Sequence, residues 1–438
     1  MAGPGLDITD IVLSAGSSVA VVGMAKNCGK TVALGAILEG VATRGIPVGV
    51  ASAGRDGEDV DAVTMLPKPP IWLPEGALFA TAERLAAKAR APIEPVAVTR
   101  HTSALGRLLV YRAIAPGKVE VGGGNSAAAA HDAVALMRRL GARFVAIDGA
   151  AGRKFSCAPS LVEATVLATG AALAATMEGV VRRTTRAVRT LTVPEWMCPV
   201  GAEALSAPLS HRDVVFIRGD ASSRRIVVPS VLARADEVAR ALTEDVETVL
   251  LGGALTGGFL RAILKRGRAS GLTVVVRDAT RILVEPGDLD RFWSAGGQVA
   301  AVHPVRLVAV TTNPTAPDGR LLDPAALLDG VAHAVAPVPA FDVVAGIARN
   351  LPAAGEAGSA MPNRSGAGGR IGVHGAPAAP AAPAALAAPA AAFDTATDTA
   401  IVAAVAAGAG RKGASDHGPG RLAVPRDDEE PPREGGVA

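Results

Sequence analysis

Aromatic residues and cysteines are scarce in this chain. Aromatic side chains make up 3% of its 438 residues, so the core must be built from Ala, Val, Leu and Ile. Such a core is common in α/β proteins with buried parallel strands. The three cysteines, Cys28, Cys157 and Cys198, stand far apart, with no C-x-x-C pair and no histidine at ligand spacing. This pattern argues against both a disulfide framework and a zinc site.

Long apolar runs and a strong charge of one sign are also missing. No stretch of about 18 uninterrupted apolar residues occurs, and the N-terminus MAGPGLDITD lacks the features of a signal peptide. The net charge of +3 is too small to imply nucleic-acid binding. The short basic cluster at residues 180–189 is typical of a solvated helix face. We therefore expect a cytoplasmic protein with neither nucleic acid nor a membrane as partner.

Apolar strands and amphipathic helices alternate along the chain to about residue 313. This order predicts an α/β fold with a doubly wound, mainly parallel sheet. We expect a P-loop NTPase-like N-terminal half at residues 1–210 and a further α/β domain at residues 211–351. The apolar stretch at residues 161–180 is expected to be a helix buried against the sheet.

The C-terminal end has a different composition. From about Pro352 the chain is rich in Ala, Pro and Gly, and no apolar periodicity survives. Such a segment buries too little surface to offset the entropy of ordering, about 1–2 kcal/mol per residue for the backbone. Residues 352–438 are therefore predicted to form a disordered low-complexity tail.

The stretch VAVVGMAKNCGKTVAL, residues 19–34, has the order of a phosphate-binding loop: strand, loop, then helix. The usual pattern, G-x-x-x-x-G-K-[ST], places its two glycines five positions apart, whereas Gly23 and Gly29 stand six apart. The loop is therefore one residue longer. A loop of this kind points backbone N–H groups into a concavity at the positive end of a helix, where they attract phosphate. The alternative is a Gly-rich turn that only joins strand to helix.

Each residue type in the loop has a part in this chemistry. Gly29 lets the backbone approach closely, Lys30 would reach the β- and γ-phosphates, and the hydroxyl of Thr31 would complete the Mg²⁺ shell. Lys26 adds a second cation. We expect ATP with Mg²⁺ to be bound by the residues of this loop, namely Gly23, Lys26, Asn27, Gly29, Lys30 and Thr31.

Two acids follow predicted strands at the carboxyl edge, where open α/β sheets bind ligands. Asp56 and Asp148 are each suited to hold Mg²⁺ or to orient the attacking group, and Lys30 and Asp148 are the expected catalytic residues. The alternatives are that Asp148 is a turn residue before Gly149 and that Asp56 is a solvated acid. Asn313 in TTNPTAP would bind a base edge, or else form an Asn-Pro turn. A second Gly-rich segment, residues 252–260, lacks a lysine.

The Gly-x₅-Gly-Lys-Thr spacing resembles the loop of dethiobiotin synthetase and its relatives. A set of six segments resembles, in the same order, the signature blocks of the lysine 5,6-aminomutase reactivase subunit KamB family: GMAKNCGKT, SAGRDGEDVD, LFATAERLA, IDGAAGRK, SLVEATVLATGAAL and VTTNPTAPDGRLLDP. The resemblance spans residues 19–344. The chain departs from the family at Cys157, where a small uncharged residue is expected, and in its long Ala/Pro tail.

The resemblance implies an ATP-binding subunit that works with a second reactivase subunit. Together they would restore lysine 5,6-aminomutase, which depends on adenosylcobalamin and pyridoxal phosphate, by nucleotide-driven exchange of damaged cofactor. The chain has no D-x-H-x-x-G motif, so the corrinoid is expected to stay with its partners. Two alternatives stay open: a synthetase that activates a small carboxylate with ATP, and a scaffold that binds nucleotide without hydrolysing it.

Overall fold

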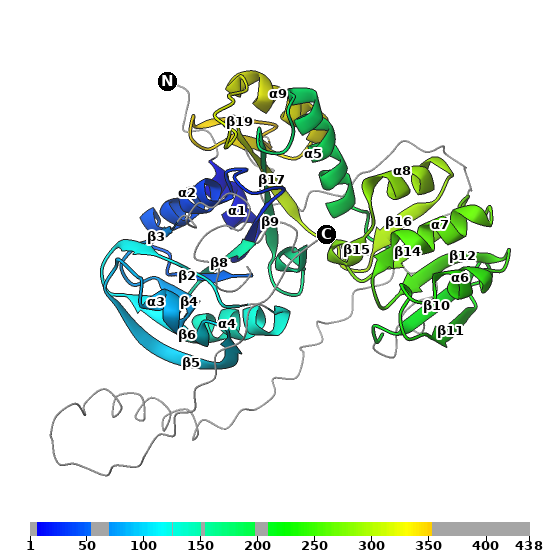
Figure 1. The fold of residues 1–438 in the computed structure, drawn as a ribbon, viewed down its shortest axis with the longest axis horizontal. Helices are drawn as coiled ribbons and strands as arrows, with labels where there is room; N and C mark the ends of the chain where they lie inside the picture. The colour runs from blue at the N-terminus through cyan, green and yellow to red at the C-terminus, as the bar shows by residue number, and fades with distance from the viewer. Residues whose placement is uncertain (1–6, 54–69, 125, 150–153, 198–208, 353–438) are drawn as a thin grey trace, which may run out of the picture. The chain divides into compact units, whose positions relative to one another are not determined.

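The computed structural model of the chain describes residues 7–53, 70–124, 126–149, 154–197 and 209–352 (Figure 1). Both of its large sheets lie within one compact unit. Asp56, Cys198 and the predicted tail after Pro352 lie outside the described residues.

Ten strands form the main sheet. Their order is β19 (Ile347–Arg349), β18 (Ala340–Asp342), β17 (Leu307–Asn313), β9 (Ala164–Gly170), β1 (Ser18–Gly23), β8 (Phe144–Gly149), β2 (Val48–Ser52), β4 (Leu78–Ala82), β6 (Gly106–Ala113) and β5 (Ile93–Ser103). From β18 to β4, neighbouring strands are parallel, whereas β19, β6 and β5 pair antiparallel at the two edges. The prediction of a large, mostly parallel sheet is confirmed.

Helices cover both faces of this sheet. Side chains alternate along β1, so Val19 and Val21 pack in one buried cluster with α1 (Ile8–Ala15) and α2 (Lys30–Thr43). Ala20 and Val22 belong to the opposite cluster. Its helices are α4 (Ala127–Arg139), α5 (Met177–Leu191) and α9 (Pro324–Val335). All six residues of β1 are buried, as expected for a strand covered on both faces.

Five strands form the second sheet. Their order is β11 (Ser223–Val227), β10 (Asp213–Arg218), β12 (Val246–Leu251), β14 (Thr273–Val276) and β16 (Gln298–Ala301). β12, β14 and β16 are parallel to one another, while β10 is antiparallel to both of its neighbours. Three helices accompany this sheet: α6 (Ala235–Arg240), α7 (Gly257–Lys265) and α8 (Pro286–Ser294). We refer to residues 213–301 as the five-stranded region.

The strand pairing differs from the expected division of the chain. The sequence grouped residues 307–349 with the second α/β domain, but β17 pairs with β9 and continues the main sheet. The five-stranded region is therefore an insertion in sequence between α5 and β17 of the main sheet. An apolar run such as that of β17 predicts a buried strand but carries no information about which sheet it joins.

The predicted buried helix at residues 161–180 is wrong. The structure instead has β9, buried at every position between β17 and β1, followed by α5 from Met177. Periodicity alone does not distinguish a fully buried strand from a buried helix. The helix signal lies further on, where the Thr176 hydroxyl caps α5 by accepting from the Gly179 N–H at 3.1 Å.

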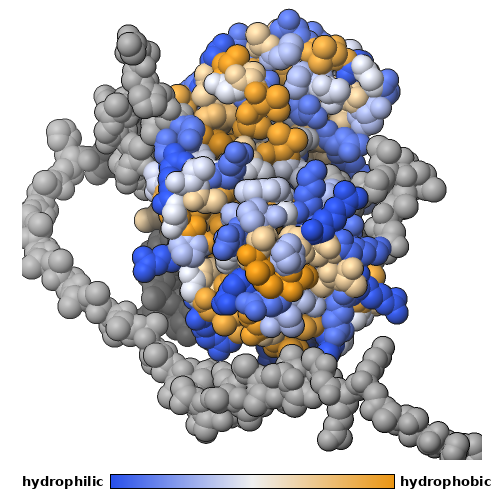
Figure 2. Space-filling view, turned by 90° about the vertical axis from the view of Figure 1, so that its left-hand side faces the viewer, coloured by the Kyte–Doolittle hydropathy of each residue, from blue (hydrophilic) through white to orange (hydrophobic). Residues whose placement is uncertain are grey.

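The smaller elements complete the description. They are β3 (Ile71–Leu73) paired with β7 (Gly117–Val119), β13 (Leu255–Thr256) paired with β15 (Ile282–Leu283), α3 (Glu83–Ala86), and the 3₁₀ turns η1 (Lys154–Cys157) and η3 (Ala279–Arg281). Among the described residues, no helix has both the length and the apolar character needed to cross a membrane. Hydrophilic and hydrophobic surfaces interleave on the face shown in Figure 2.

Candidate functional site

Parallel pairing brings the ends of four strands to one edge of the main sheet. β1 ends at Gly23, β8 at Gly149, β9 at Gly170 and β17 at Asn313. The register aligns Val21 with Asp148 on one side of β1. On the other side, Gly23 lies opposite Ala168 of β9, while Gly170, two residues further along β9, pairs with Asn313. Residues distant in sequence therefore meet around residues 24–29, which we call the β1–α2 loop.

The backbone of the β1–α2 loop is held at both ends. The Met24 N–H donates to the Ala168 carbonyl at 2.9 Å, and the Ala33 N–H donates to the Gly29 carbonyl at 3.0 Å. Asn27 (φ 62°) and Gly29 (φ 84°) adopt the left-handed conformation, which asparagine and glycine tolerate best. Gly23 fits closely as well, because an added Cβ would lie 3.1 Å from the Ala25 carbonyl oxygen.

Several backbone N–H groups of this loop have no acceptor. Within the described part of the chain, none of the N–H groups of Asn27, Cys28 and Gly29 donates a hydrogen bond. Lys30 and Thr31 are the first two residues of α2, so their N–H groups have no intrahelical partner either. The loop thus offers consecutive donors at the positive end of a helix, which is the arrangement that binds anions.

A cation and an acid lie together beside these donors. The Lys30 ammonium forms an ion pair and a hydrogen bond with the Asp148 carboxylate of β8. Both side chains are largely buried, with 22% of Lys30 and 18% of Asp148 exposed. Lys26 is exposed on the loop and Thr31 is partly buried on the first turn of α2. Of the expected site residues, only Asp56 lies outside the described part of the chain.

Cys28 is the buried residue of the β1–α2 loop. This burial raises the pKa of its thiol to about 11, although a hydrogen bond with the Ala25 backbone acts in the opposite direction. The residue is therefore a neutral, apolar anchor at physiological pH. It does not supply a thiolate nucleophile.

Asn313 contacts the loop directly. Its side-chain amide Nδ2 donates to the Asn27 carbonyl at 2.8 Å, and its Oδ1 accepts from the Thr315 N–H at 3.2 Å. The sequence predicted either a base-binding side chain or an Asn-Pro turn. In the structure, each polar atom of the Asn313 side chain makes a hydrogen bond with the backbone of the protein.

Arg320 also lies at this edge of the sheet, and the sequence does not predict it. Its guanidinium donates to the carbonyls of Ala174 and Ala175, each at 2.8 Å, and to that of Ala171 at 3.1 Å. These contacts hold the segment that follows β9 at the same edge of the sheet. A single arginine in a turn carries no sequence signal for such a role.

Metal binding by protein side chains alone has little support in this region. Among the described residues, no three His, Cys, Asp or Glu side chains are grouped so that they could hold an ion. Mg²⁺, however, usually takes only one or two protein ligands and obtains the others from phosphates and water. The Thr31 hydroxyl and the Asp148 carboxylate match that smaller requirement.

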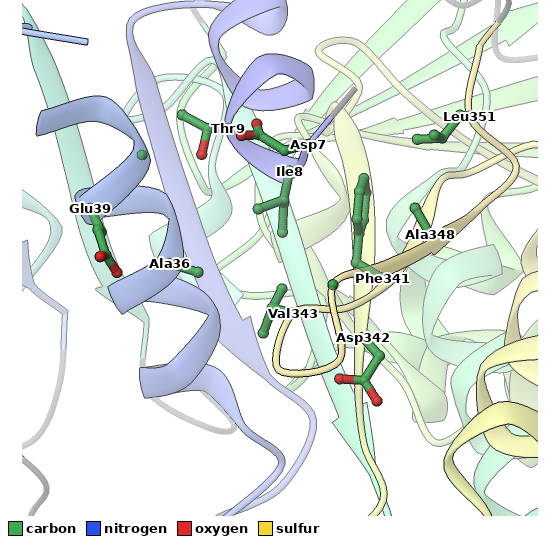
Figure 3. Close-up of a pocket in the computed structure, with 12 residues that line it drawn as sticks. Asp7, Ile8, Thr9, Ala36, Glu39, Phe341, Asp342, Val343, Ala348 and Leu351 are labelled. Carbon is green, nitrogen blue, oxygen red and sulfur yellow. The ribbon is translucent and has the colours of Figure 1, made fainter. Parts of the chain in front are cut away.

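A separate groove of about 520 Å³ lies between α1, α2 and the β18–β19 hairpin (Figure 3). Ile8, Phe341 and Val343 form part of its apolar wall, and Glu39 and Asp342 add acidic groups. No residue of the β1–α2 loop lines it. This groove is therefore distinct from the candidate site at the carboxyl edge.

Comparisons with known proteins place the chain in no group. No family model, no curated protein and no solved structure matches it.

Proposed function

We propose that this chain binds ATP and Mg²⁺ at the β1–α2 loop and is the nucleotide-binding subunit of a reactivase for adenosylcobalamin-dependent lysine 5,6-aminomutase. The observation that carries the nucleotide part is the run of unpaired N–H groups from Asn27 to Gly29, next to Lys30 at the start of α2. The reactivase part is supported by the six sequence segments that resemble the KamB family in the same order.

The residues present suit a nucleoside triphosphate with Mg²⁺. The loop N–H groups would hold phosphate oxygens, Lys30 would neutralise the β- and γ-phosphates, and Thr31 and Asp148 would hold the metal and its water. Bound ATP with Mg²⁺ would supply the phosphoryl group whose hydrolysis provides the free energy for the task.

Lys30 would couple nucleotide binding to a change in the ion pairing of the site. Its ammonium is paired with Asp148 in this structure. When Lys30 binds phosphate instead, the Asp148 carboxylate is released to orient water or to accept a proton. The site thus has two arrangements, and a partner protein that prefers one of them would be bound and released with the nucleotide cycle.

A reconstitution experiment tests this function. Lysine 5,6-aminomutase that has lost activity during turnover is mixed with this protein, its partner subunit, ATP, Mg²⁺ and fresh adenosylcobalamin. We expect mutase activity to return, and to return only with ATP. The matched control replaces this protein with its Lys30→Ala variant, which should leave the mutase inactive.

Other outcomes would contradict the proposal. Recovery with a non-hydrolysable ATP analogue through many rounds would remove hydrolysis from the mechanism. No recovery, combined with ATP consumption that depends on a small carboxylate, would favour the dethiobiotin-synthetase-like alternative.

A further inference from the structure

Asn313 is the last residue of β17 and contacts the β1–α2 loop. Its backbone carbonyl accepts from the Ala171 N–H at 2.8 Å, which ties it to the segment after β9. Its side chain ties it to Asn27 and Thr315. Of these three hydrogen bonds, only the one to Asn27 reaches the loop.

The fit between Asn313 and the loop is close. A Cβ added to Gly29 would lie 3.0 Å from the Cβ of Asn313, which is tighter than nine in ten real Cβ contacts, so one of the two residues would have to shift. Gly29 is therefore a glycine for two reasons, its left-handed φ of 84° and the Asn313 side chain packed against it.

The hydrogen bond to Asn27 determines which way one peptide group of the loop faces. In a planar trans peptide, the carbonyl and the following N–H point in opposite directions. Since the Asn27 carbonyl is held toward Asn313, the Cys28 N–H points away from Asn313. That N–H is one of the donors without an acceptor. A flip of this peptide would replace a donor by a carbonyl, which repels phosphate.

From this geometry we infer that Asn313 is a positioning residue that holds the Asn27–Cys28 peptide in the orientation that binds phosphate, and that it does not read the base. The inference rests on the proposed nucleotide function. The hydrogen bonds to Asn27 and Thr315 fix the orientation of the Asn313 amide, and only its second N–H and the second lone pair of Oδ1 remain for other contacts.

Inorganic tripolyphosphate distinguishes the two roles, because it has the phosphates of ATP and no base. We would measure dissociation constants for ATP, GTP and tripolyphosphate, each with Mg²⁺, by calorimetry on the full chain. Asn313→Ala should weaken all three by the same factor, about five- to tenfold, as expected for one lost hydrogen bond that positions the site. The ATP-to-GTP ratio should stay at the parent value.

Two further variants complete the test. Asn313→Asp keeps the shape of the side chain but replaces the donor by an acceptor, so it should weaken all three ligands at least as much as Asn313→Ala. Glu39→Gln changes an exposed residue of the same helix α2, away from the loop, and should leave every constant unchanged. Hydrogen exchange without ligand should be faster in residues 24–31 of Asn313→Ala than of the parent protein.

The results separate the two proposals. If the parent binds ATP and tripolyphosphate, but Asn313→Ala weakens ATP alone or changes the ATP-to-GTP ratio, Asn313 reads the base and only this inference is overturned. If the parent binds neither ligand, the nucleotide function itself is wrong and the inference falls with it.

Discussion

The main sheet and the five-stranded region each contain a Gly-rich segment that leads from a buried strand into a helix. In the main sheet the segment enters α2 with a left-handed Gly29, unpaired N–H groups and Lys30. In the five-stranded region, residues 252–256 lead into α7, whose N-cap residue Thr256 makes no capping hydrogen bond. The two segments look alike in the sequence.

Their surroundings differ in charge. An added Cβ at Gly257, the first residue of α7, would lie 2.6 Å from the Asp288 carboxylate, so an acid already lies at this helix start. Asp288 is 7% exposed and is paired with Arg261 and Arg291. At the start of α7 the Asp288 carboxylate, held by two arginines, lies against the first residue of the helix. At the start of α2 that place is taken by Lys30 and the unpaired N–H groups of the loop, which attract phosphate. Glycines before a helix are therefore insufficient for a phosphate site, and the groups at the helix start decide.

The largest expected effect that tests this comparison is that of Lys30→Ala. We expect ATP affinity to fall on the order of 100-fold or more, because charge-assisted hydrogen bonds to phosphate are lost. Calorimetric titration measures the affinity, and the melting temperature without nucleotide should change little. The matched control is Lys265→Ala, on the exposed surface of α7, which should bind ATP like the parent. Equal affinities for both variants would show that the charge beside the loop is unimportant.

Asp148→Asn should separate binding from turnover. The variant keeps the shape of the side chain and removes the charge that now pairs with Lys30, so ATP should still bind within about threefold of the parent affinity. Mutase reactivation should fall by on the order of 100-fold, as is usual when a group that positions a metal or a proton is lost. Paired measurements of affinity and reactivation rate check this. A variant that loses ATP binding but reactivates normally per bound nucleotide would contradict the assignment.

Gly29→Ala should affect both stability and binding. A left-handed alanine costs about 1–2 kcal/mol of unfolding free energy, and its Cβ would also press on Asn313, so ATP affinity should fall roughly tenfold. The matched control is Gly271→Ala in the five-stranded region, where φ is 74° and an added Cβ has open space around it. Urea denaturation should show a stability loss for both variants, larger for Gly29→Ala because of the contact with Asn313, and only Gly29→Ala should bind ATP more weakly.

The smallest expected effect is a loss of folding stability at alkaline pH. It should come from Cys28 in the β1–α2 loop and has no counterpart in residues 252–256. The Cys28 thiol has a pKa of about 11 in the folded chain against 9.0 as its ordinary value. Between these values the unfolded state releases the proton and the folded state keeps it, so stability falls as pH rises. At pH 10 the loss is about 1.4 kcal/mol. Denaturation curves of the parent and Cys28→Ala between pH 8 and 10.5 measure it, and parallel pH profiles would refute it.

The sequence predicted the parts of the site that depend on local pattern. The β1–α2 loop follows from a β-branched run, G-K-T and a helical repeat, all within residues 18–43. Asp148 was expected because it ends an apolar strand. By contrast, the sequence of β9 predicts a helix, since full burial removes the alternation that marks a strand.

The contacts of Asn313 and Arg320 depend on tertiary structure. Which strand lies next to β9 is decided by packing over the whole sheet, and β17 reaches that place only after the five-stranded region has intervened. The hydrogen bond from Asn313 to Asn27 and those of Arg320 to residues 171–175 follow from this pairing. No local pattern in a single sequence encodes them.

The bond between Asn27 and Asn313 also has a consequence for synthesis of the chain. The two residues are 286 positions apart, and translation adds about 5–20 residues per second. Roughly 15–60 s therefore pass between the translation of Asn27 and that of Asn313. Until then, the Asn27–Cys28 peptide of the nascent chain is not held in one orientation, and nucleotide affinity should appear late, after the five-stranded region has left the ribosome.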